Sequence, residues 1–266
     1  MLGLKVLWRA VAAIPQNGKV ALALGLPLAA LFIGFDIWRY DYAQPQQSTY
    51  LVLVFLSGLI LMLASFVLAI AWHRSLLDPR APELGRVLRR PPLWAYGWRA
   101  LVLALVVVVL VTLPVTLLSS LLVSLAYPAT TTGEIKDGYF WLGFLLGEYL
   151  GPFLRIFLLT LIGIGLPGHA IGQPVPLRES LRFGLRNAHH VLVAVLIAEL
   201  VLRLAYNILD EVLISAGPTL RVALFLGGYG LLMWLSILIA VGTITEFFRE
   251  LATRWIEPET QNAAPV

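Results

Sequence analysis

The sequence contains no cysteine, and only 13% of its 266 residues are charged. Without cysteine the chain has no disulfide, no thiolate nucleophile and no cysteine-ligated metal, so nothing indicates a redox compartment. A soluble domain has about 25% charged residues and needs about 50 or more residues of its own, whereas no polar stretch here exceeds about thirty. These shortages exclude a fused catalytic domain outside a membrane.

Catalytic motifs are missing from the sequence as well. It has no HExxH, no GxSxG and no GxxxxGK[ST], the patterns of a zinc protease, a hydrolase elbow and a phosphate-binding loop. His189 and His190 are adjacent, so on a helix they point about 100° apart and do not form a two-ligand metal face. We therefore predict no enzyme activity, no cofactor and no metal.

Apolar residues dominate the chain: 59% are hydrophobic, and the mean hydropathy is +0.86. A bilayer core about 30 Å thick needs about 20 apolar residues as a helix, so long apolar runs predict membrane spans. Six such runs are present: Val20 to Trp38, Tyr50 to Trp72, Ala100 to Tyr127, Phe140 to Leu166, Ala188 to Leu209 and Val222 to Thr245. The predicted fold is all-α, a polytopic membrane protein with one six-helix domain over residues 1–256 and a disordered polar tail at 257–266.

Positive charge is concentrated in alternate connections between these runs. Most of the nineteen basic residues lie in the N-terminal segment, the second and fourth connections and the tail: Lys5, Arg9, Lys19, Arg74, Arg80, Arg86, Arg89, Arg90, Arg99, Arg178, Arg182, Arg186, Arg249 and Arg254. The positive-inside rule then predicts that both termini are cytoplasmic. The same bias explains the net charge of +4 without a nucleic-acid partner.

A cleaved signal peptide is the competing interpretation of the N-terminus, because a basic start precedes an apolar run. That run is long for a signal peptide, Lys19 comes late, and no small-x-small cleavage site follows Trp38. We therefore interpret the run as the first span.

Short amphipathic segments precede each odd-numbered span, at Leu4 to Ile14, Pro82 to Arg90 and Leu177 to Arg186. Such helices lie flat on anionic lipid headgroups, which we expect as partners. Together with the spans they suggest three similar units, at about 1–75, 80–167 and 175–246. The alternative is that basic, partly apolar loops are common to all membrane proteins. A fourth segment, Glu246 to Ile256, follows the last span.

Charged and amide side chains interrupt the fourth and fifth spans. Glu148 and Arg155 lie in the fourth, and Glu199, Arg203 and Asn207 in the fifth. A central charge costs about 2.5–3.5 kcal/mol in the bilayer, so these groups must be paired, protonated or hydrated. Their spacing predicts two ion pairs across the hairpin, Arg155 with Glu199 and Glu148 with Arg203. The cluster is either a structural clamp or a path for a polar substrate or a proton.

Two further patterns concern helix packing and the membrane interface. Gly143, Gly147 and Gly151 form a tandem GxxxG stripe, which lets another helix approach closely. The partner is either another span of this chain or a second copy. At the end of the second span, Trp72, His73 and Arg74 indicate an interfacial box with a snorkelling arginine.

Two short runs resemble a known family. They are the run from Ala71 to Arg74, and the run from Leu166 to Gly172 with the following Leu177 to Leu181 and Asn187. Both resemble uncharacterised bacterial six-span membrane proteins of the YciC-like kind, related to the membrane domain found beside glycerophosphodiester phosphodiesterases. The resemblance implies an all-helical inner-membrane protein without an established activity, and the phosphodiesterase domain is absent.

The function that we predict from these patterns is a non-enzymatic scaffold or accessory factor that acts on lipids or a membrane partner complex through basic cytoplasmic helices. The alternative is a small transporter with a polar site formed by the fourth and fifth spans. Flat cytoplasmic helices favour the first, and a cavity that reaches Glu148 or Glu199 favours the second.

Overall fold

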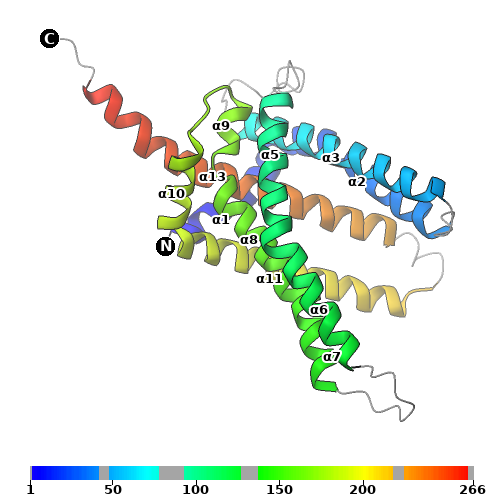
Figure 1. The fold of residues 1–266 in the computed structure, drawn as a ribbon. Coiled ribbons are helices and arrows are strands. Elements are labelled where there is room, and N and C mark those ends of the chain that lie inside the picture. Colours follow the sequence, from blue (N-terminus) through cyan, green and yellow to red (C-terminus); the bar gives the residue numbers. More distant parts are fainter. Residues whose placement is uncertain (1, 42–47, 78–92, 127–136, 218–224, 263–266) are drawn as a thin grey trace, which may run out of the picture.

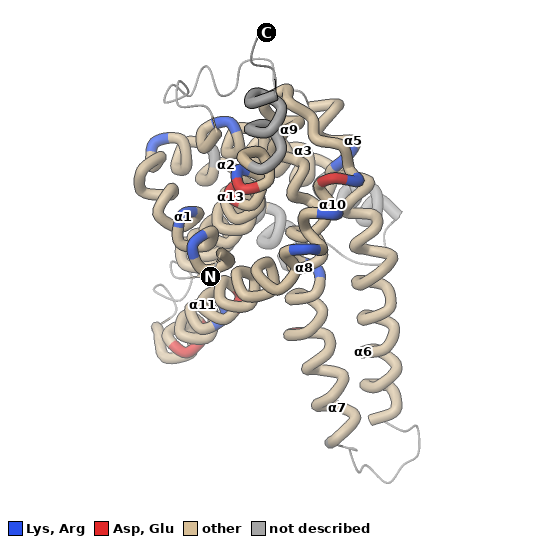
Figure 2. Tube along the Cα trace, turned by 90° about the vertical axis from the view of Figure 1, so that its left-hand side faces the viewer, with Lys and Arg blue, Asp and Glu red and all other residues tan. Residues whose placement is uncertain are grey.

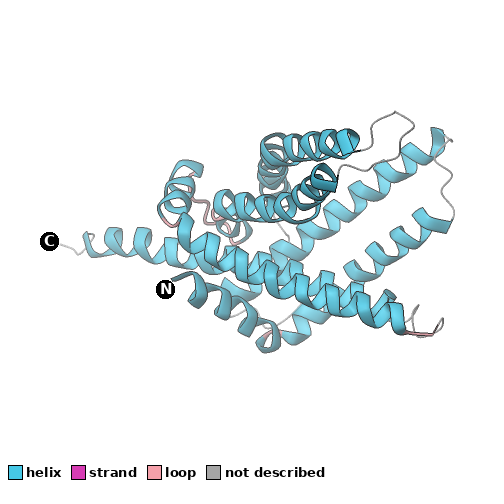
Figure 3. Cartoon of the chain, turned by 90° about the horizontal axis from the view of Figure 1, so that it is seen from below, coloured by secondary structure: helices cyan, strands magenta, loops and turns pink. Residues whose placement is uncertain are grey.

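The protein is almost entirely helical in the residues that the computed structural model describes, which are 2–41, 48–77, 93–126, 137–217 and 225–262 (Figure 1). The fold is 94% helical, and these ranges contain no strand, so the all-α prediction is confirmed (Figure 3). In chain order the elements are α1 (Leu2–Gln16), α2 (Gly18–Asp41), α3 (Ser48–Leu77), α5 (Leu93–Val107), η1 (Val108–Thr112), α6 (Leu113–Ala126), α7 (Asp137–Phe144), η2 (Leu145–Leu150), α8 (Gly151–Gly163), α9 (Leu166–Ala170), α10 (Leu177–Arg186), α11 (Ala188–Ser215), η3 (Phe225–Tyr229) and α13 (Gly230–Asn262).

Five of these helical stretches are long and apolar enough to cross a membrane: Gly58–Leu77, Leu93–Ala126, Gly138–Gly163, Ala188–Ser215 and Gly227–Thr253. They correspond to the second to sixth predicted spans. The first predicted span falls on α2, whose described apolar part, Gly18–Leu31, is shorter than a span. Five such helices indicate a multi-pass membrane protein.

The surface of the longest stretch supports the same conclusion. In Leu93–Ala126, only 11% of the most apolar window is buried inside the protein. Leu110, Leu117 and Leu121 are all exposed there. A soluble monomer rarely exposes such a large contiguous apolar surface, whereas lipid tails cover it without cost.

The hairpins diverge from a common centre. Figure 1 shows α2 and α3 side by side, pointing away from the centre in one direction, while α6 and α7 point in another. At the centre α1 packs against α11 and α13, and α8 packs against α5, α10 and α11. The main core lies where these helices meet, and Val6, Ile70, Ile164, Val191 and Phe247 are fully buried in it.

The amphipathic segments form helices that also pack against the protein. α10 has the predicted bounds, and α1 covers the predicted Leu4 to Ile14. α1 buries Val6, Ala10 and Ala13, so its apolar face contacts α11 and α13 rather than only lipid. Gly3 lies against the backbone carbonyl of His190, where a side chain would not fit. The segment Pro82 to Arg90 lies outside the described residues.

The fourth amphipathic segment, Glu246 to Ile256, belongs to α13, which ends at Asn262. Figure 2 shows the arginines and lysines of α1 and α10 well above the lower ends of α6 and α7, and α6 carries none. The basic segments therefore gather away from the α6–α7 hairpin.

Candidate functional site: a polar groove

A cavity of about 660 Å³ lies among η2, α8, α11, η3 and α13. Its apolar walls come from residues such as Ile156 and Ala198, as expected between spans. Polar side chains interrupt these walls: Glu148, Tyr149, Thr160, Glu199, Arg203, Tyr206, Asn207, Asp210, Tyr229, Ser236 and Thr243. We call this cavity the polar groove. It brings together four of the five predicted polar residues, and Arg155 is the exception.

The predicted ion pairs across the fourth and fifth spans are wrong. Arg203 pairs along its own helix instead, with its Nε 3.6 Å from Glu199 Oε2. Its guanidinium also lies 4.6 Å from the centre of the Tyr149 ring, so a cation–π contact joins α11 to η2. Arg155 is exposed and outside the groove, and neither it nor Glu148 has an ion-pair partner within the described part of the chain.

The physical reason for this difference is the π-helical turn η2. The prediction assumed a regular α-helix, in which residues seven apart lie on nearly one face. Residues Leu145–Leu150 instead form a wider turn, so Glu148 and Arg155 no longer share a face. Such turns are rare and frequently found at functional sites. Here it turns Glu148 and Tyr149 toward α11 and the groove.

Two tyrosines of the polar groove connect η3 to α11. The Tyr229 hydroxyl of η3 donates a hydrogen bond to the Asp210 carboxylate of α11. The rings of Tyr206 and Tyr229 lie 5.6 Å apart, centre to centre. These contacts fix η3 against α11. The sequence does not indicate these contacts, because η3 lies near the start of a span and no pattern shows which face of that span packs against α11.

The groove carries more negative than positive side chains. Glu148, Glu199 and Asp210 supply three carboxylates, against one guanidinium from Arg203. With the aromatic faces of Tyr149 and Tyr206, this set suits a cationic or zwitterionic ligand. Within the described ranges, no three histidine or acidic side chains gather closely enough to hold a metal ion.

The glycine stripe packs against another span of the same chain. Gly143, Gly147 and Gly151 all face α6, where Ser119 donates a hydrogen bond to the Gly143 carbonyl over 2.7 Å. A Cβ on Gly143 would lie only 3.0 Å from the Ser119 backbone oxygen. The stripe therefore makes a close contact within the chain, and pairing with a second copy stays a prediction.

Trp72 and His73 of the predicted interfacial box are buried inside the protein. His73 is 1% exposed, and its Nδ1 lies 2.7 Å from Thr245 Oγ1, while its Nε2 lies 3.1 Å from the Tyr96 hydroxyl. Thr245 donates its only proton to the Val241 carbonyl, so His73 must donate through Nδ1 and accept from Tyr96 through Nε2. Arg74 is half-buried and donates to the Ala170 carbonyl over 2.7 Å. Their position relative to the membrane interface stays a prediction.

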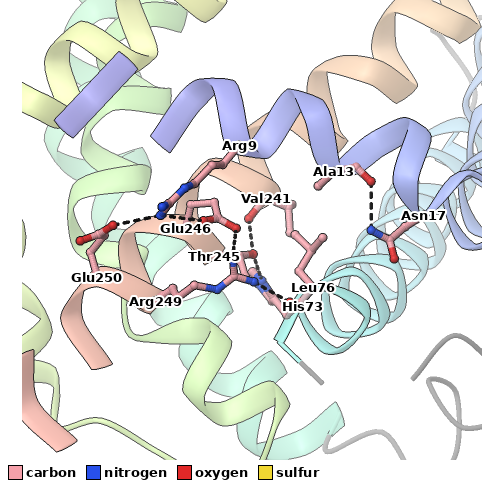
Figure 4. A network of polar contacts seen from close by, with 10 residues as sticks. All are labelled: Arg9, Ala13, Asn17, His73, Leu76, Val241, Thr245, Glu246, Arg249 and Glu250. Carbon is pink, nitrogen blue, oxygen red and sulfur yellow. Dashed lines mark hydrogen bonds and ion pairs between the residues drawn. The ribbon is translucent and has the colours of Figure 1, made fainter. Parts of the chain in front are cut away.

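A second buried network joins α1, α3 and α13, and Figure 4 shows it beside His73. Glu246 is 2% exposed and lies 2.7 Å from Arg249 Nη1, and Arg249 also donates to the Leu76 carbonyl. Arg9 lies 3.1 Å from Glu250 and 3.9 Å from Glu246. The spacing of Glu246, Arg249 and Glu250 on one helix is readable in the sequence, but the contact with Arg9 is not.

No family model matches the sequence, and comparisons with curated proteins and with solved structures gave no match either. The resemblance to YciC-like membrane proteins therefore stays a prediction. The function has to be argued from the groove itself.

Proposed function

We propose that the protein is a small transporter that binds a cationic or zwitterionic molecule in the polar groove and carries it across the membrane. One observation supports this most: a cavity of about 660 Å³, lined by Glu148 and Glu199, between helices that are otherwise apolar. The sequence alone ranked a scaffold first. A cavity that reaches both glutamates favours the transporter instead.

The charged side chains of the polar groove are not all paired with an opposite charge. A charge in the bilayer interior costs about 2.5–3.5 kcal/mol unless it is paired or hydrated. Only the Glu199 and Arg203 charges form a pair in the groove, and that pair lies along one helix, where it does not clamp two spans together. Water or a polar ligand in the groove would satisfy Glu148, and excess negative charge selects a cation.

The topology belongs to the same proposal. We take α2 as the first of six spans and place both termini on the cytoplasmic face of a bacterial inner membrane. The positions of Lys5, Arg9, Arg182 and Arg186 on α1 and α10 support this orientation under the positive-inside rule. The proposal includes no chemical step, since the groove offers no paired nucleophile and base.

The binding test uses the purified protein in a non-ionic detergent. A panel of cationic, zwitterionic, neutral and anionic small molecules is scored by the rise in unfolding temperature, because a ligand at about 100 times its Kd stabilises by about 2.7 kcal/mol. We expect only cations or zwitterions to stabilise. The effect should disappear in Glu148→Gln and persist in Glu179→Gln, which alters an acidic residue of α10 outside the groove. Stabilising compounds are then tested for uptake into proteoliposomes.

A yield measurement separates a transport path from a structural clamp. Because Glu199 pairs within α11, Glu199→Gln should fold with nearly normal yield in the membrane and lose the stabilisation by the ligand. A strongly reduced yield would favour the clamp. Stabilisation by anions alone would contradict the proposed substrate class.

A scaffold at the lipid surface is the second candidate, and α10 is the observation that favours it. This helix buries Ser180, Phe183 and Gly184 and leaves a row of Leu177, Leu181 and Leu185 exposed. A fluorophore on the single cysteine of Leu181→Cys should shift its emission to the blue more in phosphatidylglycerol than in phosphatidylcholine proteoliposomes. Equal emission in the two lipids would remove this support.

A further inference from the structure

A second cavity, of about 340 Å³, lies among α5, α8, α9 and α10, apart from the polar groove. Its lining includes Arg99 and His169 together with the apolar Trp98, Val102 and Ile162. A cavity lined by a cation and by apolar side chains fits an amphiphile with an anionic head. This site does not depend on the proposed transport function.

His169 lacks a partner that its position requires. The side chain is 8% exposed, and its buried Nε2 has no hydrogen-bond partner among the residues described. A buried polar atom without a partner costs about 1–3 kcal/mol, so it is rarely retained unless a ligand or water completes it. His169 is one of the residues that line the second cavity.

The backbone around His169 holds the ring in place. Gly168 lies against the Gln173 carbonyl and the Phe248 ring, so α9 packs directly on the next turn and on α13. Gly172 adopts a φ of 77°, which allows the chain to reverse after α9. The Gln173 amide donates to the Gly168 carbonyl over 2.8 Å and closes this turn. The histidine is therefore positioned by rigid structure.

Both polar groups of the cavity are able to donate hydrogen bonds. Burial lowers the pKa of His169, and the positive charge of Arg99 lowers that pKa further, so the ring is neutral and carries one N–H. Arg99 adds a guanidinium with a permanent charge. The Ser180 hydroxyl donates to the Leu177 carbonyl over 3.0 Å and so offers no proton to the cavity.

We propose that this second cavity binds the phosphate of an anionic phospholipid, with Arg99 and His169 Nε2 as donors and an acyl chain along Val102 of α5. The apolar side chains that line the cavity favour a lipid over a free phosphate. Val102 and Trp98 are exposed on α5, and the exposed apolar surface continues from them along the helix to Leu105. A free phosphate would gain nothing from that surface, whereas an acyl chain would lie along it.

The test measures lipid binding to the full chain in non-ionic detergent by native mass spectrometry. Phosphatidylglycerol and diacylglycerol with identical acyl chains are compared, and inorganic phosphate is the competitor. We expect phosphatidylglycerol to bind at least about tenfold more tightly, because diacylglycerol has no phosphate and a charge-assisted hydrogen bond is worth roughly that factor or more. Millimolar inorganic phosphate should not displace it. Displacement would assign the site to free phosphate and overturn the lipid proposal.

Variants then locate the preference. Arg99→Gln and His169→Phe should each reduce the preference for phosphatidylglycerol about tenfold. Arg186→Gln and His189→Phe are matched controls at exposed positions outside the cavity and should leave it unchanged. An unchanged preference in both test variants, or an equal loss in Arg186→Gln, would overturn the proposal. If Arg99→Gln does not fold, Arg99→Lys, which keeps the charge, takes its place. The comparison of the two lipids on the wild-type protein is decisive without either variant.

Discussion

Replacing Gly143 by alanine tests the close packing of the fourth span on the third. The added Cβ would lie 3.0 Å from the Ser119 backbone oxygen and 3.0 Å from Val123 Cγ2. The backbone oxygen belongs to α6 and has no rotamer by which to move aside. The Ser119 hydroxyl is also bonded to the Gly143 carbonyl, so any separation of the helices weakens that bond as well.

The expected magnitude follows from two opposing terms. Alanine favours a helix over glycine by about 1 kcal/mol, and overpacking costs about 1–3 kcal/mol. The matched control is Gly138→Ala on the same helix α7, because a Cβ there would meet nothing within 4 Å. The control should be neutral or up to about 1 kcal/mol more stable, and Gly143→Ala should be about 1–3 kcal/mol less stable than the control.

The assay is thermal unfolding in detergent, followed by tryptophan fluorescence and by monodispersity on gel filtration. A difference of about 1–3 kcal/mol corresponds to several degrees between the two variants. Equal unfolding temperatures for Gly143→Ala and Gly138→Ala would refute the close approach of α7 to α6. A loss of dimer with no change in monomer stability would instead assign the stripe to a second copy.

The remaining predictions concern the two buried networks and the second cavity. His73→Phe should destabilise the protein by about 1–3 kcal/mol, because it leaves the buried Tyr96 hydroxyl without its acceptor. The control His189→Phe, at an exposed position, should change stability by less than about 0.5 kcal/mol. Thermal unfolding in detergent compares the two variants. Arg249→Gln removes the nearest cation from buried Glu246 and should lower the free energy of unfolding by about 1–3 kcal/mol, a range that allows for the partial exposure of the arginine. Arg182→Gln is the control, because its ion pair is exposed. An effect of Arg249→Gln no larger than that of Arg182→Gln would contradict this prediction. Because the pKa of His169 is lowered on folding, the unfolded state binds the proton first, so its contribution to stability is present above pH of about 6.5 and falls as the pH drops below it. His169→Gln should flatten this part of the pH profile, and an unchanged profile would exclude His169 as its source.

Local patterns in the sequence predicted what depends on local structure. Five of the six predicted apolar runs form helices long enough to span a membrane, because helix length and composition are carried by consecutive residues. The alternation of leucine and arginine predicted α10 with its observed bounds, Leu177–Arg186. The spacing of Gly143, Gly147 and Gly151 predicted a close helix contact, though not that α6 is the partner.

The contacts that the sequence did not predict depend on tertiary structure or on irregular helix geometry. The ion pairs predicted for Glu148 and Arg155 assumed an uninterrupted α-helix, and the π turn η2 changes the face of every residue around it. His73 was predicted at the interface because the sequence places it at the end of a span. Its burial depends on Thr245, which is 172 positions away in the chain, and on Tyr96.

Solvent access to the polar groove is the most direct test of the proposed function. The chain has no native cysteine, so Asn207→Cys on α11 introduces a unique thiol that lines the groove. Leu204→Cys is the control on the same helix, because Leu204 is 60% exposed but lies outside the groove, on a surface that lipid would cover. In intact membranes, a charged, membrane-impermeant thiol reagent should modify the cysteine at position 207 and leave the one at 204 unmodified. Modification of both positions, or of neither, would contradict a hydrated groove within the membrane.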